Sequence, residues 1–88
     1  MIRRRVIVHG FVQGVFFRDT LRRRATAVGV SGWVRNNRDG TVEAVFEGEE
    51  DAVERLITVC REGPRGARVD RVDVTPEEPE GLACFQVG

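Results

Sequence analysis

A chain of 88 residues has room for one small hydrophobic core, so we expect residues 1–88 to form a single domain. Fourteen basic residues, all of them arginine, balance fourteen acidic residues, and this zero net charge argues against a protein that binds polyanions over its whole surface. The lack of lysine excludes Schiff-base chemistry, and no run approaches the roughly 18 apolar residues of a membrane-spanning helix.

The first third of the chain predicts a strand, a loop and a helix. Val6–Val8 is a β-branched run that stops at Gly10. The segment Gly10–Arg18 is interrupted by glycine and is too apolar for an ordinary surface loop. From Phe17 onwards, apolar residues recur at helical spacing, which predicts a helix that ends at Gly29. The apolar face of this helix consists of Phe17, Leu21, Ala25 and Val28.

Two strands joined by a tight turn follow. We expect them at Val30–Arg35 and Thr41–Glu47, because Asp39-Gly40 between them is a strong signal for a β-hairpin. The second strand alternates between apolar and polar residues, as a strand with one buried face does. Its apolar residues are Val42, Ala44 and Phe46, and its polar residues are Thr41, Glu43 and Glu47.

The last third predicts a second helix and two more strands. The helix runs from about Glu49 to Glu62 and is stopped by Gly63-Pro64. A strand then precedes the prolines at 76 and 79, and a short strand at Cys84–Val87 ends the chain. The residues on which these predictions rest are Ala52, Val53, Leu56, Ile57 and Cys60 in the helix, and Val69, Val72 and Val74 in the strand.

The order β-α-β-β-α-β with an extra C-terminal strand predicts an α+β fold. Two helices and one sheet pack most simply as the ferredoxin-like split βαβ arrangement, an antiparallel sheet with both helices on one face. The opposite face is then expected to be partly solvated, in keeping with the threonine and glutamates of Thr41–Glu47.

The segment Gly10–Arg18 is a candidate anion site because it joins a strand to the start of a helix. A helix N-terminus presents unpaired N–H groups and a positive dipole end, and Gly10 and Gly14 allow the backbone to turn towards a ligand. Arg18, in the first turn, could grip a phosphoryl group with two parallel hydrogen bonds. On spacing alone, an ordinary surface arginine remains the alternative.

Asn36 and Asn37 form the second candidate site, at the end of a strand. Asparagine is a common turn residue, so the pair could serve only to shape the hairpin. An asparagine side chain can also orient a water molecule, because it both donates and accepts hydrogen bonds without titrating.

The remaining chemistry-bearing residues argue against a metal site or a covalent intermediate. His9 is the only histidine, and Cys60 and Cys84 are expected to be small core thiols of a cytoplasmic protein. Asp70 and Asp73 are three apart on a strand and so point to opposite faces. We therefore expect no cofactor, no metal and no nucleophile carried by the protein.

A ferredoxin-like sheet could alternatively bind RNA. Arg3–Arg5 and Arg22–Arg24 are basic, and Phe11, Phe16 and Phe17 lie between them. The aromatic pattern of RNA-recognition strands is missing from Thr41–Glu47, however, and its glutamates would repel phosphates. Solvated helix and edge arginines are therefore favoured, and a non-catalytic anion- or RNA-binding module remains the alternative function.

Two long motifs resemble the paired signature of the acylphosphatases. They are Gly10-x-Val12-Gln13-Gly14-Val15-x-Phe17-Arg18 and Gly32-Trp33-Val34-x-Asn36-x-x-x-Gly40-x-Val42-Glu43. A third stretch, Gly63-Pro64-x-x-Ala67-x-Val69-x-x-Val72, is similar to the family's segment between its second helix and fourth strand.

This resemblance implies hydrolysis of the carboxyl–phosphate anhydride of acyl phosphates to a carboxylate and inorganic phosphate. It also implies that Arg18 binds the phosphoryl group and that Asn36 positions the attacking water. The loop expected to surround the phosphate consists of Val12, Gln13, Gly14, Val15, Phe16, Phe17 and Arg18. Phe11 and Phe16 depart from the family's usual small or polar residues at the mouth of the pocket. The expected protein is a stand-alone cytoplasmic monomer that binds neither membrane nor nucleic acid.

Overall fold

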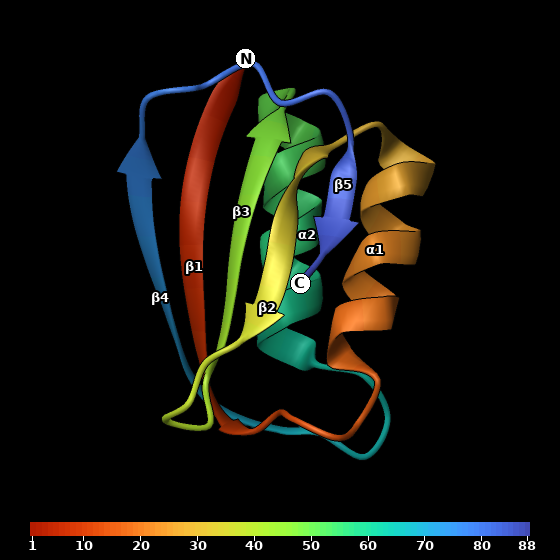
Figure 1. Cartoon of the computed structure of the whole chain (residues 1–88), viewed down its shortest axis with the longest axis vertical. Helices are drawn as coiled ribbons and strands as arrows, with labels where there is room; N and C mark the ends of the chain where they lie inside the picture. Colours follow the sequence, from red (N-terminus) through yellow and green to blue (C-terminus); the bar gives the residue numbers. More distant parts are fainter.

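The computed structural model describes residues 1–88 and contains five strands and two helices. Figure 1 shows them in chain order as β1 (Ile2–Phe11), α1 (Phe17–Val28), β2 (Ser31–Asn36), β3 (Val42–Gly48), α2 (Glu50–Glu62), β4 (Arg68–Glu77) and β5 (Phe85–Val87). Every element expected from the sequence is present. The main difference is the length of β1, which starts at Ile2 rather than Val6.

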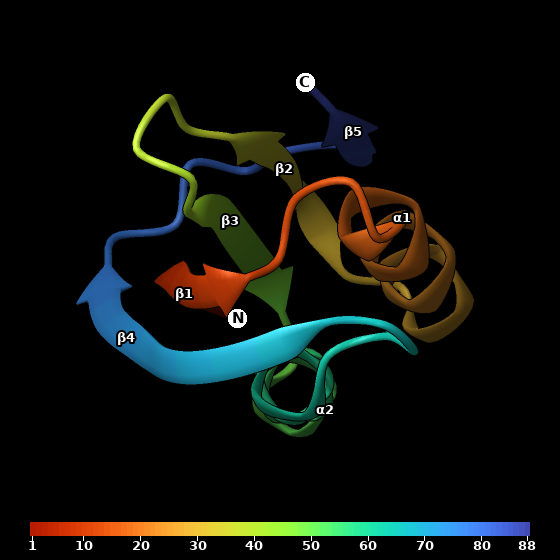
Figure 2. The ribbon, with the colours of Figure 1, turned by 90° about the horizontal axis from the view of Figure 1, so that it is seen from below.

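The strands form one sheet in the order β4-β1-β3-β2-β5. β1 pairs antiparallel with β3 and with β4, and β2 pairs antiparallel with β3. β5 pairs parallel with β2, so the short C-terminal strand makes the sheet mixed. Both helices lie on one side of the sheet (Figure 2). This is the ferredoxin-like βαββαβ arrangement with an extra strand, and the predicted fold class is confirmed.

The core lies between the sheet and the two helices. Alternate residues of the strands and one face of each helix meet there, as expected from the spacing of apolar residues in the strand and helix segments of the sequence. Phe17, Leu21 and Ala25 of α1 are buried, whereas Val28 is only half-buried. Gly29 ends α1 in the left-handed region with φ 74°, where its N–H donates to the carbonyls of Ala25 and Thr26.

The outer face of β3 is buried, which corrects the expectation that it is partly solvated. Thr41, Glu43 and Glu47 are only 6%, 8% and 1% exposed. The physical reason is that β3 is the middle strand of the sheet. Long side chains on β1 and β2 therefore reach over it from both sides. The arginines that cover it are Arg3, Arg5 and Arg35, each paired with a glutamate of β3.

Arg3 was expected to be a solvated edge residue but is buried on the outer face of the sheet, with 3% of its surface exposed. Its Nη1 donates to Glu47 Oε2 at 2.7 Å, and its Nε donates to Glu77 Oε1 at 2.9 Å. The Glu47 carboxylate also accepts hydrogen bonds from three backbone N–H groups of the segment that joins β4 to β5. This ion pair therefore anchors that segment to the end of β3.

Two further details differ from the expectations. Cys60 is buried as predicted, but Cys84 is exposed because it directly precedes β5, a short strand at the edge of the sheet. A β-bulge interrupts the pairing of β1 with β4 between His9 and Gly10. The bulge places one extra residue in β4, between the partners of His9 and Gly10. This extra residue explains how Val69 and Val72, three apart in the sequence, both pack against the core.

Candidate active site

The segment from Val12 to Phe16 links β1 to α1 and passes below the carboxyl end of β2 (Figure 1). None of its backbone N–H groups donates a hydrogen bond to another backbone group. The first helical hydrogen bond runs from the N–H of Thr20 to the carbonyl of Phe16 at 3.0 Å. The loop and the first turn of α1 therefore present free donors at the positive end of the helix, which suits an anion.

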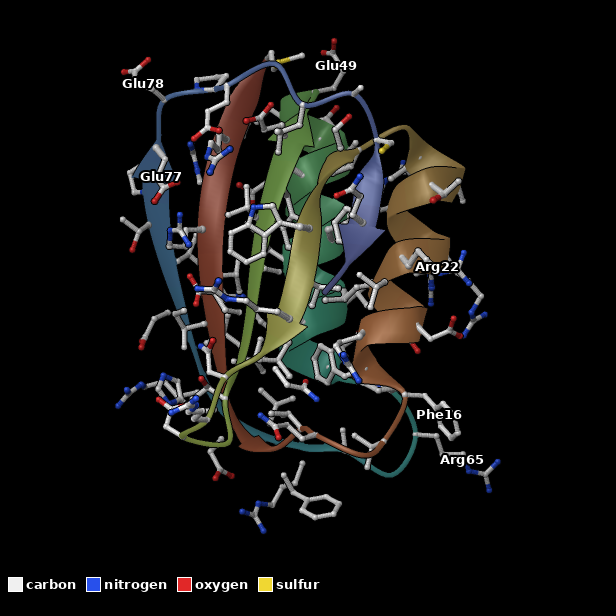
Figure 3. The ribbon with its side chains drawn as sticks, viewed as in Figure 1. Phe16, Arg22, Glu49, Arg65, Glu77 and Glu78 are labelled. Carbon is white, nitrogen blue, oxygen red and sulfur yellow. The ribbon has the colours of Figure 1, made fainter.

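Two residues of this loop have left-handed backbone conformations. Gly14 has φ 74°, and Phe16 has φ 60°, the only non-glycine residue with positive φ. Phe16 projects away from the ribbon just before α1 (Figure 3) and is 82% exposed. A left-handed conformation is unfavourable for a bulky residue, so the loop holds a strained backbone directly beside the candidate site.

A cleft of about 430 Å³ opens beside this loop. It brings Arg18 and Asn36, which are 18 residues apart in sequence, to one place, together with part of the expected loop. Gln13 and Val15 belong to the loop but do not line the cleft. The lining residues are Val12, Gly14, Phe16, Phe17, Arg18, Asp19, Arg22, Asn36 and Val87.

Arg18 reaches the cleft from the first turn of α1. Its Nη1 donates to the backbone carbonyl of Gly88 at 2.6 Å, and the N–H of Gly88 donates to the carbonyl of Val34 at 2.8 Å. Gly88, which follows β5, therefore holds the guanidinium in place. Because a guanidinium has five N–H donors, the bond to Gly88 leaves others for a ligand.

Asn36 is the last residue of β2 and shares the helix-side face of that strand with Val34. Its Oδ1 is buried and accepts no hydrogen bond from the protein. A buried acceptor without a partner is unusual and unfavourable. A water molecule in the cleft could donate to it, and Asn36 Oδ1 would then fix the position of that water.

Asn37 lies on the opposite face of the sheet. Its Nδ2 donates to Thr41 Oγ1 at 3.1 Å and to Glu43 Oε1 at 3.2 Å. These are contacts within the hairpin, and Asn37 does not line the cleft. The alternation of a strand thus separates the two neighbouring asparagines, one towards the cleft and one towards the turn.

Three lining residues were not among the sequence candidates: Asp19, Arg22 and Val87. Arg22 lies four residues after Arg18, a spacing that places both on one face of a helix and could have revealed it. Arg22 Nη2 lies 2.9 Å from Asp19 Oδ1, and Arg23 also bonds Asp19. Hydrogen bonds from these two arginines lower the pKa of the Asp19 carboxyl.

Arg22 therefore has an acidic partner, which it shares with Arg23, whereas Arg18 is paired with no acidic side chain. Figure 3 shows Arg22 on the outer side of α1. Of the two arginines that line the cleft, Arg18 is thus the one without an ion pair to an acidic side chain, and it lies at the helix end where the free N–H groups are.

Other titratable groups lie away from the cleft. His9 Nε2 lies 2.9 Å from Asp73 Oδ2, between β1 and β4. Burial raises the pKa of the Cys60 thiol to about 12, so this cysteine stays protonated near neutral pH. No cluster of three or more histidine, cysteine, aspartate or glutamate side chains is arranged to hold a metal ion. Neither helix is long and apolar enough to cross a membrane.

The fold and the cleft define an α+β domain of the ferredoxin-like type with a candidate anion site at a strand–helix junction. Comparison with known proteins agrees with this class. The family model named Acylphosphatase matches residues 4–87. An acylphosphatase of Rubrobacter xylanophilus is 61% identical over 79 residues, which cover 90% of this chain and 72% of that protein. One from Thermococcus kodakarensis is 54% identical over 86 residues, which cover 98% and 94%.

Solved structures give the same result. The crystal structure of acylphosphatase from Bacillus subtilis superposes with a TM-score of 0.96 at 35% identity, covering 100% of this chain and 99% of that one. Full-length HypF in a phosphate- and nucleotide-bound form superposes with a TM-score of 0.92 at 30% identity, covering 99% of this chain but 12% of HypF. The chain belongs to the acylphosphatase family.

Proposed function

We propose that this acylphosphatase hydrolyses the carboxyl–phosphate anhydride of acyl phosphates in the cleft between the β1–α1 loop and the end of β2. The products are a carboxylate and inorganic phosphate. Water attacks phosphorus directly, with no covalent intermediate on the protein and no metal ion. Residues 1–88 act as one domain in this proposal.

The phosphoryl group is held by the loop and by Arg18. The N–H groups from Val12 to Phe17 surround it, and the guanidinium supplies positive charge and paired donors. This assignment is supported by two features of the cleft. The loop N–H groups from Val12 to Phe16 have no backbone acceptor, and Arg18 forms no ion pair with an acidic side chain.

The buried, unpartnered Oδ1 of Asn36 is the observation that carries the catalytic part of the proposal. It accepts a hydrogen bond from the attacking water and holds that water opposite the leaving carboxylate. Phosphoryl transfer is catalysed mainly by positioning and charge stabilisation, and a carboxylate is a good leaving group. A strong base is therefore not required, and a phosphate oxygen of the substrate takes the proton of the water.

The alternative function, a non-catalytic anion- or RNA-binding module, is less well supported. A binding module has no need of a buried acceptor beside its anion site. Arg3 and Arg5 on the outer face of the sheet are already paired with glutamates, so they offer little free charge to RNA. We therefore propose a small-molecule acyl phosphate as partner and no nucleic acid. The free thiols of Cys60 and Cys84 fit the reducing cytoplasm, and we propose a monomer there.

The test compares two neighbouring residues in a benzoyl phosphate assay with EDTA present. Asn36→Ala should lower kcat by roughly 10²–10³, the scale for losing one preorganised polar group. Its inhibition constant for phosphate should stay near wild type, because the loop and Arg18 are unchanged. The matched control, Asn37→Ala, should lose stability in the turn but keep its rate.

Two results would contradict the proposal. One is an inactive Asn37→Ala protein beside an active Asn36→Ala protein. The other is wild-type activity that disappears on chelation and returns with magnesium or zinc, since direct attack by water as proposed needs neither.

A further inference from the structure

The side chain of Gln13 is the direct link between the β1–α1 loop and the β2–β3 turn. Its Nε2 donates to the backbone carbonyl of Asn37 at 2.7 Å and to that of Thr41 at 2.9 Å. Both N–H donors of one amide are therefore used, and the contact is partly buried. These carbonyls flank the turn on its two sides, and Gln13 itself does not line the cleft.

The two ends of this link belong to the two halves of the site. Gln13 lies between Val12 and Gly14, inside the loop assigned to the phosphoryl group. Asn37 directly follows Asn36, the residue assigned to the water. A change in the distance between loop and turn would therefore move the water relative to phosphorus.

Asn36 depends on its backbone for its position. Its side chain forms no hydrogen bond with the protein, so no side-chain bond holds its amide in place. The backbone of Asn36 pairs with Val42 of β3, and this is the last residue pair between β2 and β3. Beyond this pair, the turn is held to the loop by Gln13.

We propose that Gln13 is a positioning residue that sets the distance between the phosphoryl group and the water held by Asn36. The inference rests on the proposed function, because it takes the role of Asn36 from there. Reactions that depend on positioning are sensitive to small displacements, and about 1 Å can cost roughly 10²-fold in rate. Gln13 thus acts on the rate through Asn36 and not by binding the substrate with its side chain.

The experiment uses Gln13→Met, which keeps the length of the side chain and removes both donors, with Gln13→Ala as a second variant. Both keep the backbone N–H of residue 13, so phosphate should inhibit them as it inhibits wild type. We expect kcat to fall by roughly 10- to 10²-fold with little change in KM. Gln86→Ala is the matched control, because Gln86 is exposed and bonds only the Cys84 thiol, at 3.8 Å.

A double-mutant cycle separates positioning from general stabilisation. If Gln13 acts through Asn36, adding Gln13→Met to Asn36→Ala should lower kcat no further than Asn36→Ala does alone. Thermal unfolding, measured on the same proteins, identifies any fraction that is unfolded at the assay temperature, and the rates are expressed per folded molecule.

The outcomes distinguish this inference from the proposed function. An unchanged kcat in Gln13→Met, or losses that multiply in the double variant, overturns the positioning role and leaves the role of Asn36 intact. A wild-type kcat in Asn36→Ala overturns the proposed function and this inference with it. Weaker phosphate inhibition in Gln13→Met, without a fall in kcat, would instead place Gln13 in the binding of phosphate.

Discussion

Arg18 and Arg22 lie one turn apart on α1 and both line the cleft, yet their environments differ. Arg22 pairs with Asp19, whereas Arg18 bonds only the carbonyl of Gly88. Arg18 therefore forms no ion pair with an acidic side chain, in contrast to Arg22. The phosphoryl group of the substrate can therefore supply the missing negative charge, which makes Arg18 the better candidate of the two.

The shape of the Arg18 side chain matters as much as its charge. Arg18→Ala should abolish turnover and weaken phosphate inhibition by about 10- to 150-fold, which corresponds to roughly 1.5–3 kcal/mol for a charge-assisted hydrogen bond. Arg18→Lys should restore little of this, because an ammonium group cannot bond Gly88 and grip two phosphate oxygens with a planar fork. Steady-state kinetics with phosphate as inhibitor measures both effects.

Arg23→Ala is the control for this prediction, because Arg23 is exposed and contacts only Asp19. It should leave kcat and phosphate inhibition near wild type. Near-normal turnover in Arg18→Lys would show that charge alone suffices at this position.

At the scale of elements, the β1–α1 loop owes its shape to backbone conformations that few residues adopt. Gly14 has φ 74° and open space around the position of a Cβ, so a side chain there would meet conformational strain and no collision. Since Gly14 also lines the cleft, strain at this position acts directly on the N–H groups that face the anion.

Gly14→Val should therefore weaken phosphate inhibition although it changes no charge. The left-handed conformation costs an ordinary residue roughly 1–2 kcal/mol, and a β-branched side chain at least that much. Gly29→Val is a closely matched control, since Gly29 has the same φ of 74° and equally open space at the far end of α1. Both variants should lose similar stability in urea unfolding, but only Gly14→Val should bind phosphate more weakly. Equal phosphate inhibition in the two would contradict the loop assignment.

At the scale of the whole molecule, a buried ion pair holds the end of the sheet opposite the cleft. Burial opposes ionisation of Glu47. Hydrogen bonds from the N–H groups of Glu80, Gly81 and Leu82 and from Arg3 outweigh it, and the pKa of Glu47 falls below its usual value. A lowered pKa in the folded state means that the ionised group favours folding.

Glu47→Gln should destabilise the protein by about 3 kcal/mol at pH 7, because it leaves Arg3 buried with a partner removed. The contribution of Glu47 is complete above about pH 4.5, its ordinary value, and is lost as the pH falls through the lower pKa of the folded state. The difference in free energy of unfolding between wild type and variant should therefore narrow from pH 7 towards pH 3. Urea unfolding across this range measures it.

Glu80→Gln serves as the control, because the Glu80 side chain is 65% exposed and only supplements the same arginine. It should unfold nearly as wild type does at each pH. A constant difference between wild type and Glu47→Gln down to pH 3 would contradict the lowered pKa.

The sequence by itself determined the elements and the pair of candidate site residues. Apolar residues at the spacing of a helix or a strand mark a buried face wherever that face lies, so α1, α2 and the hairpin were predictable within a residue or two. The two signature motifs named Arg18 and Asn36, and strand alternation separated Asn36 from Asn37. These are local properties, which depend on neighbours a few residues away.

Only the tertiary structure decided which side chains of different elements contact one another and which are buried. Whether Glu43 and Glu47 are solvated depends on the arginines that β1 and β2 place beside β3, and strand order is not encoded in the alternation of one strand. For the same reason, the sequence did not predict the exposure of Cys84. The bonds of Gln13 to the turn and of Arg18 to Gly88 join residues 24 or more apart in the chain, and such contacts exist only once the fold has brought their segments together.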